Sequence, residues 1–333
     1  MRIGLTYDLK DEYLAAGFSA DEVAELDCAV TIDGIKAALT AQGHTVDRIG
    51  NVTSLTRSLA EGRRWDLVFN IAEGVRGLGR EAQIPALLDA WNIPYTFSGP
   101  ELLALTLHKG WTNAVIRAHG LPTADFRIVA DQDTAEGVDL PFPLFVKPVA
   151  EGSSKGVSAK SLVCDRTQLR EVCAQILTTY RQPALVETYL PGREFTVGLL
   201  GSGQKARVVG VLEVRTTAEG DRAAYTFANK QDWKKRVAYD LATDAKAQAA
   251  ADLALASWRA LGCLDAGRID VRLDDQGEAR FIEVNPLAGL NPESSDLPIL
   301  CRKVGLEYDR LITHIVDSAR LRMVSGQRAP GHA

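Results

Sequence analysis

Residues 267–285 read GRIDVRLDDQGEARFIEVN, and this stretch is the most informative part of the chain for both fold and function. Charged and apolar residues alternate over 268–272, so the charged side chains share one face of a strand. The Asp- and Gly-rich run 274–277 is typical of a tight turn between two strands. The stretch therefore predicts an antiparallel hairpin with one polar face.

Pairing across this hairpin brings two acidic residues together. A turn centred on residues 276–277 places Asp270 opposite Glu283 and Arg268 opposite Asn285. Two like charges directly opposite each other repel, and a hard cation would reverse that effect, because carboxylate and amide oxygens are ligands of Mg²⁺. The hypothesis is a metal site at this position. The alternative is a solvated outer face, and a register slip of one residue would separate the pair.

A second informative stretch is the strand-like run 142–148, which contains Lys147. The loop EGSSKGV follows at 151–157, and a further strand is expected over 156–162. Glycines allow a ligand to come close, and serine hydroxyls with successive N–H groups can surround phosphate oxygens. The Walker pattern G-x-x-x-x-G-K-[ST] is missing here. The loop favours a lid over a triphosphate, although an ordinary hairpin loop has the same composition.

Two glutamates follow in the next strands. Glu187 lies in the run 184–192, and Glu194 begins the run 194–200 after a Pro-Gly turn. Either carboxylate could accept hydrogen bonds from an adenine amino group or from ribose hydroxyls. Each could equally be an ordinary surface carboxylate.

The bulk composition excludes several classes of protein. The chain has 333 residues and a formal net charge of −5, which gives no electrostatic reason to expect a nucleic-acid partner. Five cysteines without a C-x-x-C pair predict free thiols rather than a disulfide framework or a zinc site. The N-terminus lacks a signal-peptide pattern, and no window has transmembrane length. We therefore expect a cytoplasmic protein that does not enter a membrane.

The order of elements predicts two kinds of sheet. Strands alternate with helices over roughly the first 100 residues, including a helix whose apolar positions run from Val23 to Leu39, and this alternation indicates a parallel α/β layer. From about residue 140, short strands separated by Pro and Gly indicate antiparallel α+β structure. We expect domains at 1–107, 108–192 and 193–325.

Together these features resemble the ATP-grasp superfamily and, within it, the D-alanine–D-alanine ligase family. The resemblance covers about 65–322. It is carried by Asn92–Gly99, Val146-Lys147-Pro148 with Gly152-Ser153-Ser154-x-Gly156, Glu187 with Glu194–Val197, Gly267–Val271, and Glu283–Pro286. It implies an ATP-grasp fold, with a Rossmann-like N-terminal parallel sheet followed by two antiparallel α+β subdomains that clasp ATP.

The resemblance also implies roles for individual residues. Lys109, Lys147 and Lys230 match lysines that hold ATP phosphates, and Ser153, Ser154 and Gly156 match the lid. Glu187 and Leu190 match adenine contacts, and Glu194 matches the ribose ligand. Asp270, Glu283 and Asn285 match ligands of Mg²⁺, with two ions expected and Mn²⁺ as a substitute. Arg268 and the backbone of Gly289 match groups that stabilise the acyl phosphate and tetrahedral intermediate.

The departures from the family lie on the amino-acid side. The short glycine-rich first loop is replaced by the longer acidic stretch 8–21, and Gln231 stands where the family has tyrosine. The family's His-Gly loop is replaced by residues 70–82, and the run after Asn285 differs as well. We expect the substrate pocket to be shaped by residues 8–13 together with Glu73, Arg80, Glu81 and Ser294, although charged loop residues are usually only solvated.

These observations predict an ATP-dependent, ADP-forming ligase that joins a carboxylate to an amine through an acyl phosphate. The expected substrates are two amino acids or similar small compounds. One alternative is a true D-alanine–D-alanine ligase of peptidoglycan precursor synthesis, and another is a non-catalytic ATP-binding regulatory subunit. A hydroxy-acid or thiol acceptor also stays open. The resemblance allows a homodimer, for which the residues themselves give no signal.

Overall fold

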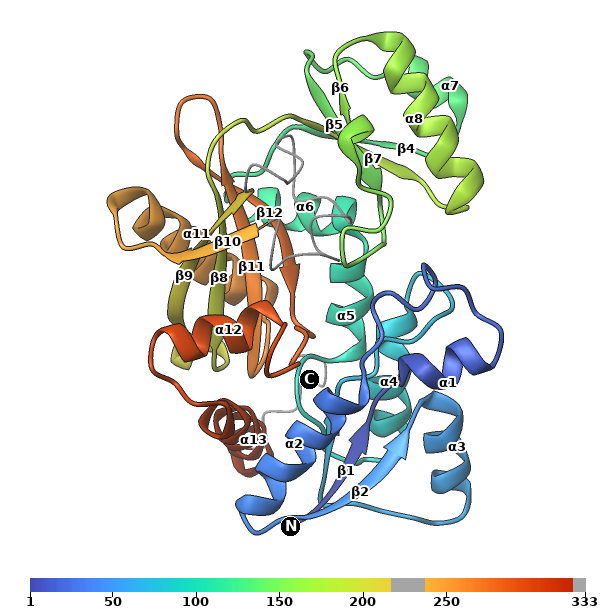
Figure 1. The fold of residues 1–333 in the computed structure, drawn as a ribbon, viewed down its shortest axis with the longest axis vertical. Helices are drawn as coiled ribbons and strands as arrows, with labels where there is room; N and C mark the ends of the chain where they lie inside the picture. The colour runs from blue at the N-terminus through green and yellow to red at the C-terminus, as the bar shows by residue number, and fades with distance from the viewer. Residues whose placement is uncertain (217–236, 326–333) are drawn as a thin grey trace.

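The computed structural model describes residues 1–216 and 237–325, which form three sheets with helices packed around them (Figure 1). The N-terminal sheet has the parallel order β2-β1-β3. Its elements and neighbours are β1 (Arg2–Thr6), α1 (Lys10–Ala15), α2 (Ala29–Ala41), β2 (Thr45–Gly50), α3 (Val52–Ala60), β3 (Leu67–Asn70), the 3₁₀ helix η1 (Arg80–Ala82), α4 (Gln83–Ala90) and α5 (Pro100–Leu107). This part confirms the predicted parallel α/β layer.

The second sheet is antiparallel, in the order β4-β7-β5-β6, and forms a separate lobe at the upper right of Figure 1. The chain reaches it through α6 (Lys109–Ala118). Its elements are β4 (Phe126–Val129), α7 (Gln132–Glu136), β5 (Leu144–Pro148), η2 (Ala159–Ser161), β6 (Leu162–Val163), α8 (Arg166–Thr179) and β7 (Ala184–Thr188).

The third sheet is antiparallel as well, in the order β10-β9-β8-β11-β12. Its elements are β8 (Glu194–Leu200), η3 (Gly203–Lys205), β9 (Arg207–Thr216), β10 (Val237–Leu241), α11 (Ala245–Leu261), β11 (Ala266–Leu273), β12 (Ala279–Asn285), α12 (Asp296–Lys303) and α13 (Tyr308–Ser325). The predicted change from parallel to antiparallel sheet is therefore confirmed, although the antiparallel part begins at β4 (Phe126–Val129), before the predicted residue 140.

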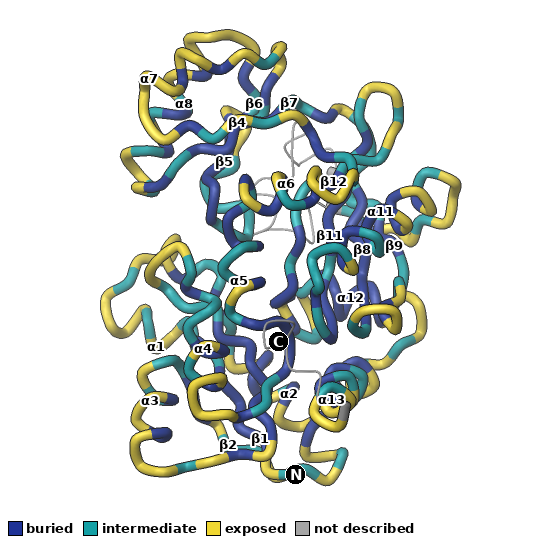
Figure 2. Tube along the Cα trace, turned by 180° about the vertical axis from the view of Figure 1, so that it is seen from behind, coloured by how far each residue is buried: buried dark blue, intermediate teal, exposed yellow. Residues whose placement is uncertain are grey.

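The core of the N-terminal sheet includes residues from the far end of the chain. Ile3 and Ile35 are fully buried in one cluster with Leu311 and Ile315 of α13, which packs against α2. Buried positions run along the strands of all three sheets, while the outer loops are exposed (Figure 2). Each sheet lies within one predicted domain, and the boundaries at 107 and 192 remain predictions.

Two local predictions are wrong. The helix expected from Val23 begins only at Ala29, although Val23 is buried, because residues 20–26 form turns that bring this side chain into the core. The strand expected over 156–162 is reduced to Leu162–Val163, preceded by the short helix η2. Ser158 begins η2 by accepting a hydrogen bond from the Lys160 N–H, which favours a turn over an extended strand. Among the described residues, no helix is both long and apolar enough to span a membrane.

Candidate active site

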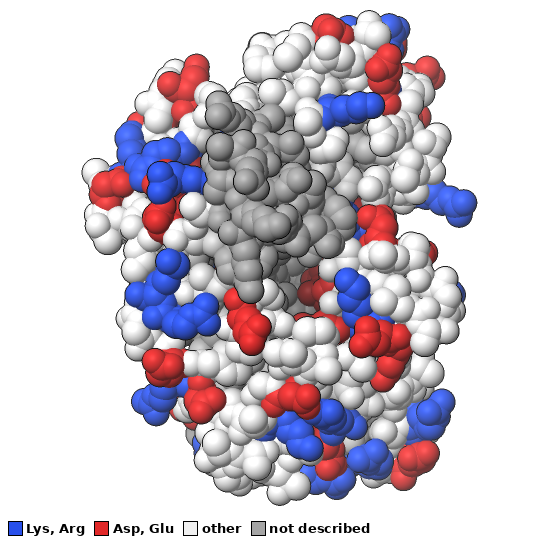
Figure 3. Space-filling view, viewed as in Figure 1, with Lys and Arg blue, Asp and Glu red and all other residues white. Residues whose placement is uncertain are grey.

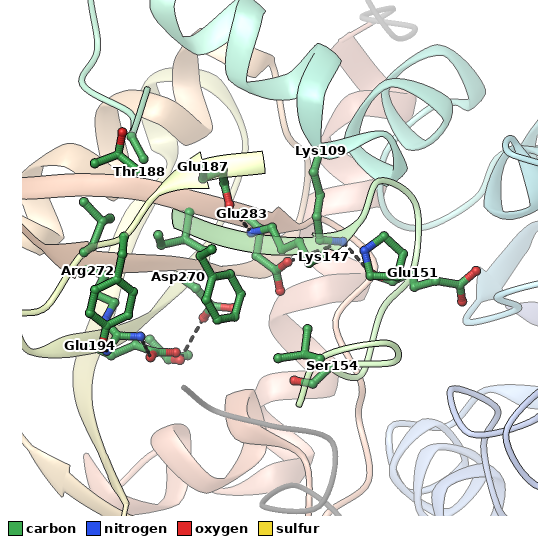
Figure 4. Close-up of a pocket in the computed structure, with 18 of the residues that line it drawn as sticks. Lys109, Lys147, Glu151, Ser154, Glu187, Thr188, Glu194, Asp270, Arg272 and Glu283 are labelled. Carbon is green, nitrogen blue, oxygen red and sulfur yellow. Dashed lines mark hydrogen bonds and ion pairs between the residues drawn. The ribbon is translucent and has the colours of Figure 1, made fainter. Parts of the chain in front are cut away.

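The predicted hairpin forms one wall of a pocket between the second and third sheets (Figure 4). Arg268 pairs with Asn285 and Asp270 with Glu283, as the sequence predicts. The register shifts by one residue between Asp270 and Val271, so Val271 pairs with Phe281. Such a bulge inserts one extra residue into a strand. The two acids are opposite each other because this bulge compensates for a turn one residue away from the predicted position.

Asp270 is held in a buried network. It accepts a hydrogen bond from Thr196 Oγ1 at 2.8 Å and forms an ion pair with Arg268, whose guanidinium also lies 3.7 Å from Asp296. Burial raises the pKa of the Asp270 carboxyl to about 6, and although Arg268 opposes this shift, Glu283 adds to it. The carboxylate pair therefore favours a cation in its neighbourhood.

The residues near this pair fit a hard metal ion. The Asn285 Nδ2 atom is buried and has no hydrogen-bond partner among the described residues. A half-turn of the amide would put its oxygen at that position, which gives the donor set Asp, Glu and Asn that suits Mg²⁺. In the described part of the chain no group of three His, Cys, Asp or Glu side chains could hold a metal. A metal here would therefore also need oxygens from a substrate, as Mg²⁺ commonly does with phosphates.

Lys147 lies on the opposite side of the pocket and is almost fully buried. Its Nζ atom lies 2.8 Å from Glu187 Oε2, and Asn113 of α6 donates a hydrogen bond to Glu187 Oε1 at 3.0 Å. Burial lowers the pKa of Lys147, but the carboxylates of Glu187, Glu283 and Glu194 outweigh it and the net pKa is raised. The amine thus keeps its charge, and both oxygens of Glu187 are engaged within the protein.

Two further cations, Arg272 and Lys109, line this pocket. Arg272 Nη1 lies 3.3 Å from Glu194 Oε2, and burial raises the pKa of Glu194 in spite of that neighbour. Lys109, the first residue of α6, donates a hydrogen bond to the backbone oxygen of Glu151 at 2.6 Å and lies 3.4 Å from Glu283. Leu190 contributes an apolar surface at the far end. The pocket thus offers lysines, carboxylates and an apolar patch.

The loop after β5 folds back over the pocket. Ser153 and Ser154 have φ angles of 49° and 57°, a left-handed backbone that is uncommon for serine. Gly156 has φ 75°, and a Cβ atom there would lie 2.4 Å from the Pro148 ring, so only glycine fits. The loop is therefore held in a compact shape by its own sequence.

The same loop is fastened to the N-terminal part of the chain. Glu25 accepts hydrogen bonds from the Gly152 N–H at 2.7 Å and from Arg80 Nη2 at 2.8 Å, and Arg80 Nη1 donates to the Ala150 oxygen at 3.0 Å. The side chains of Glu25 and Arg80 are each only 8% exposed. Arg80 does not line either cavity; the structure places it behind the wall, where it holds Glu25.

A second cavity of about 450 Å³ opens on the N-terminal side, and it shares Lys109, Arg268 and Glu283 with the first pocket. Three predicted positions, Glu73, Glu81 and Ser294, line it. Ser153, Asn285 and Gly289 do so as well. The two spaces thus meet at the residues that the sequence predicts for the chemistry.

Carboxyl groups on this second wall have raised pKa values. Burial, with a contribution from Glu81, raises the pKa of Glu73 well above its ordinary value. Burial also raises the pKa of Glu81 to about 7, against the attraction of Arg80. Asp27 likewise has a pKa raised by burial to about 7. These groups face the cavity and are costly to keep ionised without a cation.

Known proteins share this sequence pattern. The family described as D-ala D-ala ligase C-terminus matches residues 115–317. This chain belongs to the D-alanine–D-alanine ligase family. A protein named D-alanine–D-alanine ligase from Gluconobacter oxydans is 33% identical over 94% of this chain and 100% of its own length. An uncharacterized protein of Sinorhizobium fredii is also 33% identical, over 87% of each chain.

Solved structures of the family share the fold. The D-alanine–D-alanine ligase from Bacillus anthracis in complex with ATP superposes with a TM-score of 0.73 at 21% identity, over 98% of this chain and 100% of its own. A second structure of the same Bacillus anthracis enzyme gives a TM-score of 0.75 at 20% identity. At this identity the likeness shows the ATP-grasp fold, which the sequence predicts.

Some residues of the site were not predicted. Glu25, Asp27 and Asp296 line the second cavity, but none of them belongs to a motif that carries the resemblance. For Glu25 and Asp27 the only sequence signal is the acidic character of the preceding N-terminal stretch, and Asp296 comes directly after the run in which this chain departs from the family. Lys230 lies outside the described residues, so its place beside the phosphates remains a prediction.

Proposed function

We propose that this chain is an ATP-dependent ligase that activates a carboxylate as an acyl phosphate and joins it to an amine, with two amino acids or similar small compounds as substrates. The observation that carries the proposal is the shared wall of the two cavities. Arg268, Glu283 and Lys109 face both spaces, so a phosphoryl group leaving one can meet a carboxylate held in the other.

The nucleotide fits the pocket between the two antiparallel sheets. We assign Lys147 and Lys109 to its phosphates, Glu194 to the ribose and Leu190 to the base. Glu187 serves chiefly by keeping Lys147 charged and in place, because both of its carboxylate oxygens are already engaged. Lys230 is assigned to the phosphates from the sequence alone.

Asp270, Glu283 and Asn285 would hold Mg²⁺, or Mn²⁺ as a substitute. A metal bound there would neutralise charge on the phosphates and polarise the bond to the transferred group. The protein's own contribution is to keep the three oxygen donors on one face of the hairpin, with Arg268 beside them.

The chemistry follows from these positions. A carboxylate is a poor acyl donor until one of its oxygens carries a phosphoryl group. Arg268 and the Gly289 N–H would stabilise charge on the acyl group as the amine attacks. The acyl phosphate reacts readily with water, so Ser153, Ser154 and Gly156 in the closed loop serve to exclude it. The amine then displaces phosphate.

The test is a screen for ADP release over pairs of D- and L-amino acids, with product masses identified. We expect release that depends on both partners and a product that has lost one water. If no amino-acid pair raises ADP release above that of the Asp270→Asn variant, the proposal fails.

A true D-alanine–D-alanine ligase is the second candidate, and the 33% identity to the Gluconobacter oxydans protein over 94% of this chain favours it. Exclusive turnover of D-alanine with itself would establish that candidate over the broader one. In either case we propose a cytoplasmic enzyme acting on small molecules rather than on nucleic acid or membrane, consistent with its net charge of −5.

A further inference from the structure

The substrate cavity has an excess of acidic groups on its wall. Besides Glu283, five carboxylates line it: Glu25, Asp27, Glu73, Glu81 and Asp296. Among the residues that the structure describes, the cations on this wall are Lys10, Lys109 and Arg268. Lys109 and Arg268 stand at the phosphate end, where they already face Glu283 and Asp270. Acidic side chains are visible inside the hollow beside the part drawn in grey, whereas both signs are interspersed over the rest of the face that is shown (Figure 3).

Three of the five carboxylates have partners inside the protein. Glu25 is held by Arg80, and Asp296 accepts a hydrogen bond from Tyr239 at 2.8 Å and faces Arg268. A hydrogen bond from Thr31 lowers the pKa of Asp27 against the larger effect of burial. These contacts give Glu25, Asp27 and Asp296 partners within the protein.

Glu73 and Glu81 are different. Neither carboxylate accepts a hydrogen bond from the described residues, although both side chains are partly buried and line the cavity. Arg80, which precedes Glu81 in the chain, directs its guanidinium to Glu25 and to the Ala150 oxygen instead. Two partly buried carboxylates that repel each other therefore face an open space that a ligand can fill.

The charge and hydrogen-bonding capacity of Glu73 and Glu81 indicate which kind of ligand group would bind them. No group of three His, Cys, Asp or Glu side chains in the described ranges could hold a metal, so a metal bound by Glu73 and Glu81 would need further ligands from a substrate. A simple amino acid is a zwitterion and brings no net positive charge. An ammonium group has three donors, enough to bind two carboxylates at once.

We propose that the cavity selects a substrate with a second ammonium group, a diamino acid or a diamine, and that Glu73 and Glu81 bind this group. The inference rests on the proposed function, since it concerns one of the two substrates of that reaction. Charge-assisted hydrogen bonds of this kind contribute enough to give roughly a 10- to 100-fold preference over a neutral analogue of the same shape.

The experiment is calorimetric titration of the full chain with Mg²⁺ and a non-hydrolysable ATP analogue present. The probes are D- and L-ornithine, the norvaline enantiomers, which lack the terminal amine, and 1,4-diaminobutane. We expect ornithine of one configuration to bind at least tenfold more tightly than norvaline. Diaminobutane binding as tightly as ornithine identifies a diamine, and weaker binding identifies a diamino acid. Norvaline binding equal to that of ornithine, or no ornithine binding at millimolar concentration, overturns the inference.

Variants show which residues are responsible. In the double variant Glu73→Gln, Glu81→Gln the ratio of ornithine to norvaline affinity should fall to about one. The control Glu12→Gln removes an acid of the same type that is exposed and outside the cavity, and the ratio should persist. A ratio that survives in the double variant contradicts the assignment. The inference and the proposed function can fail separately, because binding is measured without turnover. If the chain releases ADP with neutral amino acids but does not bind ornithine more tightly than norvaline, this inference is refuted and the proposed function stands.

Discussion

The nucleotide pocket and the substrate cavity share a wall but differ in how their charges are paired. In the pocket, Lys147 faces Glu187, Arg272 faces Glu194, and Arg268 faces Asp270. In the cavity, Glu73 and Glu81 have no donor among the residues that the structure describes.

This difference indicates which charged groups serve any nucleotide and which recognise a particular substrate. Paired groups keep their charge and position without a ligand, so they can serve any substrate that brings a triphosphate. Unpaired groups are costly until a particular ligand arrives, so they report on its identity. The predictions below test this contrast by removing groups on each side.

The largest effect is expected at the shared wall. Asp270→Asn should lower turnover by about 10³-fold, because it removes both a metal ligand and the partner of Arg268. The measurement is ADP release at saturating ATP and Mg²⁺. Asp274→Asn is the control: its carboxylate pairs with Arg280 at the hairpin turn, and turnover should stay within a few-fold of the unaltered chain. Equal losses in the two variants would mean that Asp270 acts only through folding.

The paired charges of the nucleotide pocket should be sensitive to removal of one member. Lys147→Met leaves Glu187 buried without its cation, and the free energy of unfolding should fall by about 3–4 kcal/mol. Chemical denaturation measures this change. The double variant Lys147→Met, Glu187→Gln removes both charges and should recover most of the stability without recovering nucleotide binding. Recovery of nucleotide binding would contradict the assignment of Lys147 to the phosphates.

In the cavity, removal of the charged groups should raise the free energy of unfolding instead of lowering it. A carboxyl with a raised folded-state pKa destabilises the fold as pH rises from its ordinary value of 4.5 toward its folded value, which is about 7 for Glu81. The free energy of unfolding of the double variant Glu73→Gln, Glu81→Gln should therefore be ~3 kcal/mol higher than that of the unaltered chain above pH 7. This difference should vanish below about pH 4.5. Denaturation at pH 4.5 and pH 8 measures it, and a stability loss at pH 8 would show that these acids are paired.

The smallest effect is expected where the cavity is fastened to the lid. Glu25→Gln keeps an acceptor for the Gly152 N–H but loses its charge toward Arg80. We expect a few-fold rise in phosphate released per molecule of ligated product, because water enters the loosened loop. Parallel assays of phosphate and product measure that ratio. An unchanged ratio would mean that Glu25 does not position the lid.

Much of the nucleotide pocket could be predicted because its residues lie on strands with a period of two. The alternation in 268–272 places Arg268, Asp270 and Arg272 on one face, and the structure retains that face. The pairing of Asp270 with Glu283 depends on more than this alternation. The hairpin turn lies one residue from its predicted position, and the bulge beside Asp270 restores the pairing. A bulge depends on the neighbouring strands and leaves no clear signal in a short sequence.

The cavity wall could be predicted only in part. Glu73, Glu81 and Ser294 stand out as departures from a family pattern, but the place of Arg80 could not be inferred, since its partner Glu25 is 55 residues away. Residues 20–26 form turns rather than the expected helix, so no periodicity indicates which side chains face inward.

The sequence by itself determined the change from parallel to antiparallel sheet and the polar face of the hairpin, because strand alternation depends on local geometry. The residue roles and the ligase chemistry followed from the resemblance of its ordered motifs to a known family. Tertiary structure alone decided that Asp270 meets Glu283 through a bulge, that Arg80 turns to Glu25, and that Glu73 and Glu81 are left facing the cavity. The physical reason is the distance along the chain over which each feature is decided. Neighbouring residues decide which side chains share a strand face, whereas the partner of a charged side chain depends on which distant segment packs against it.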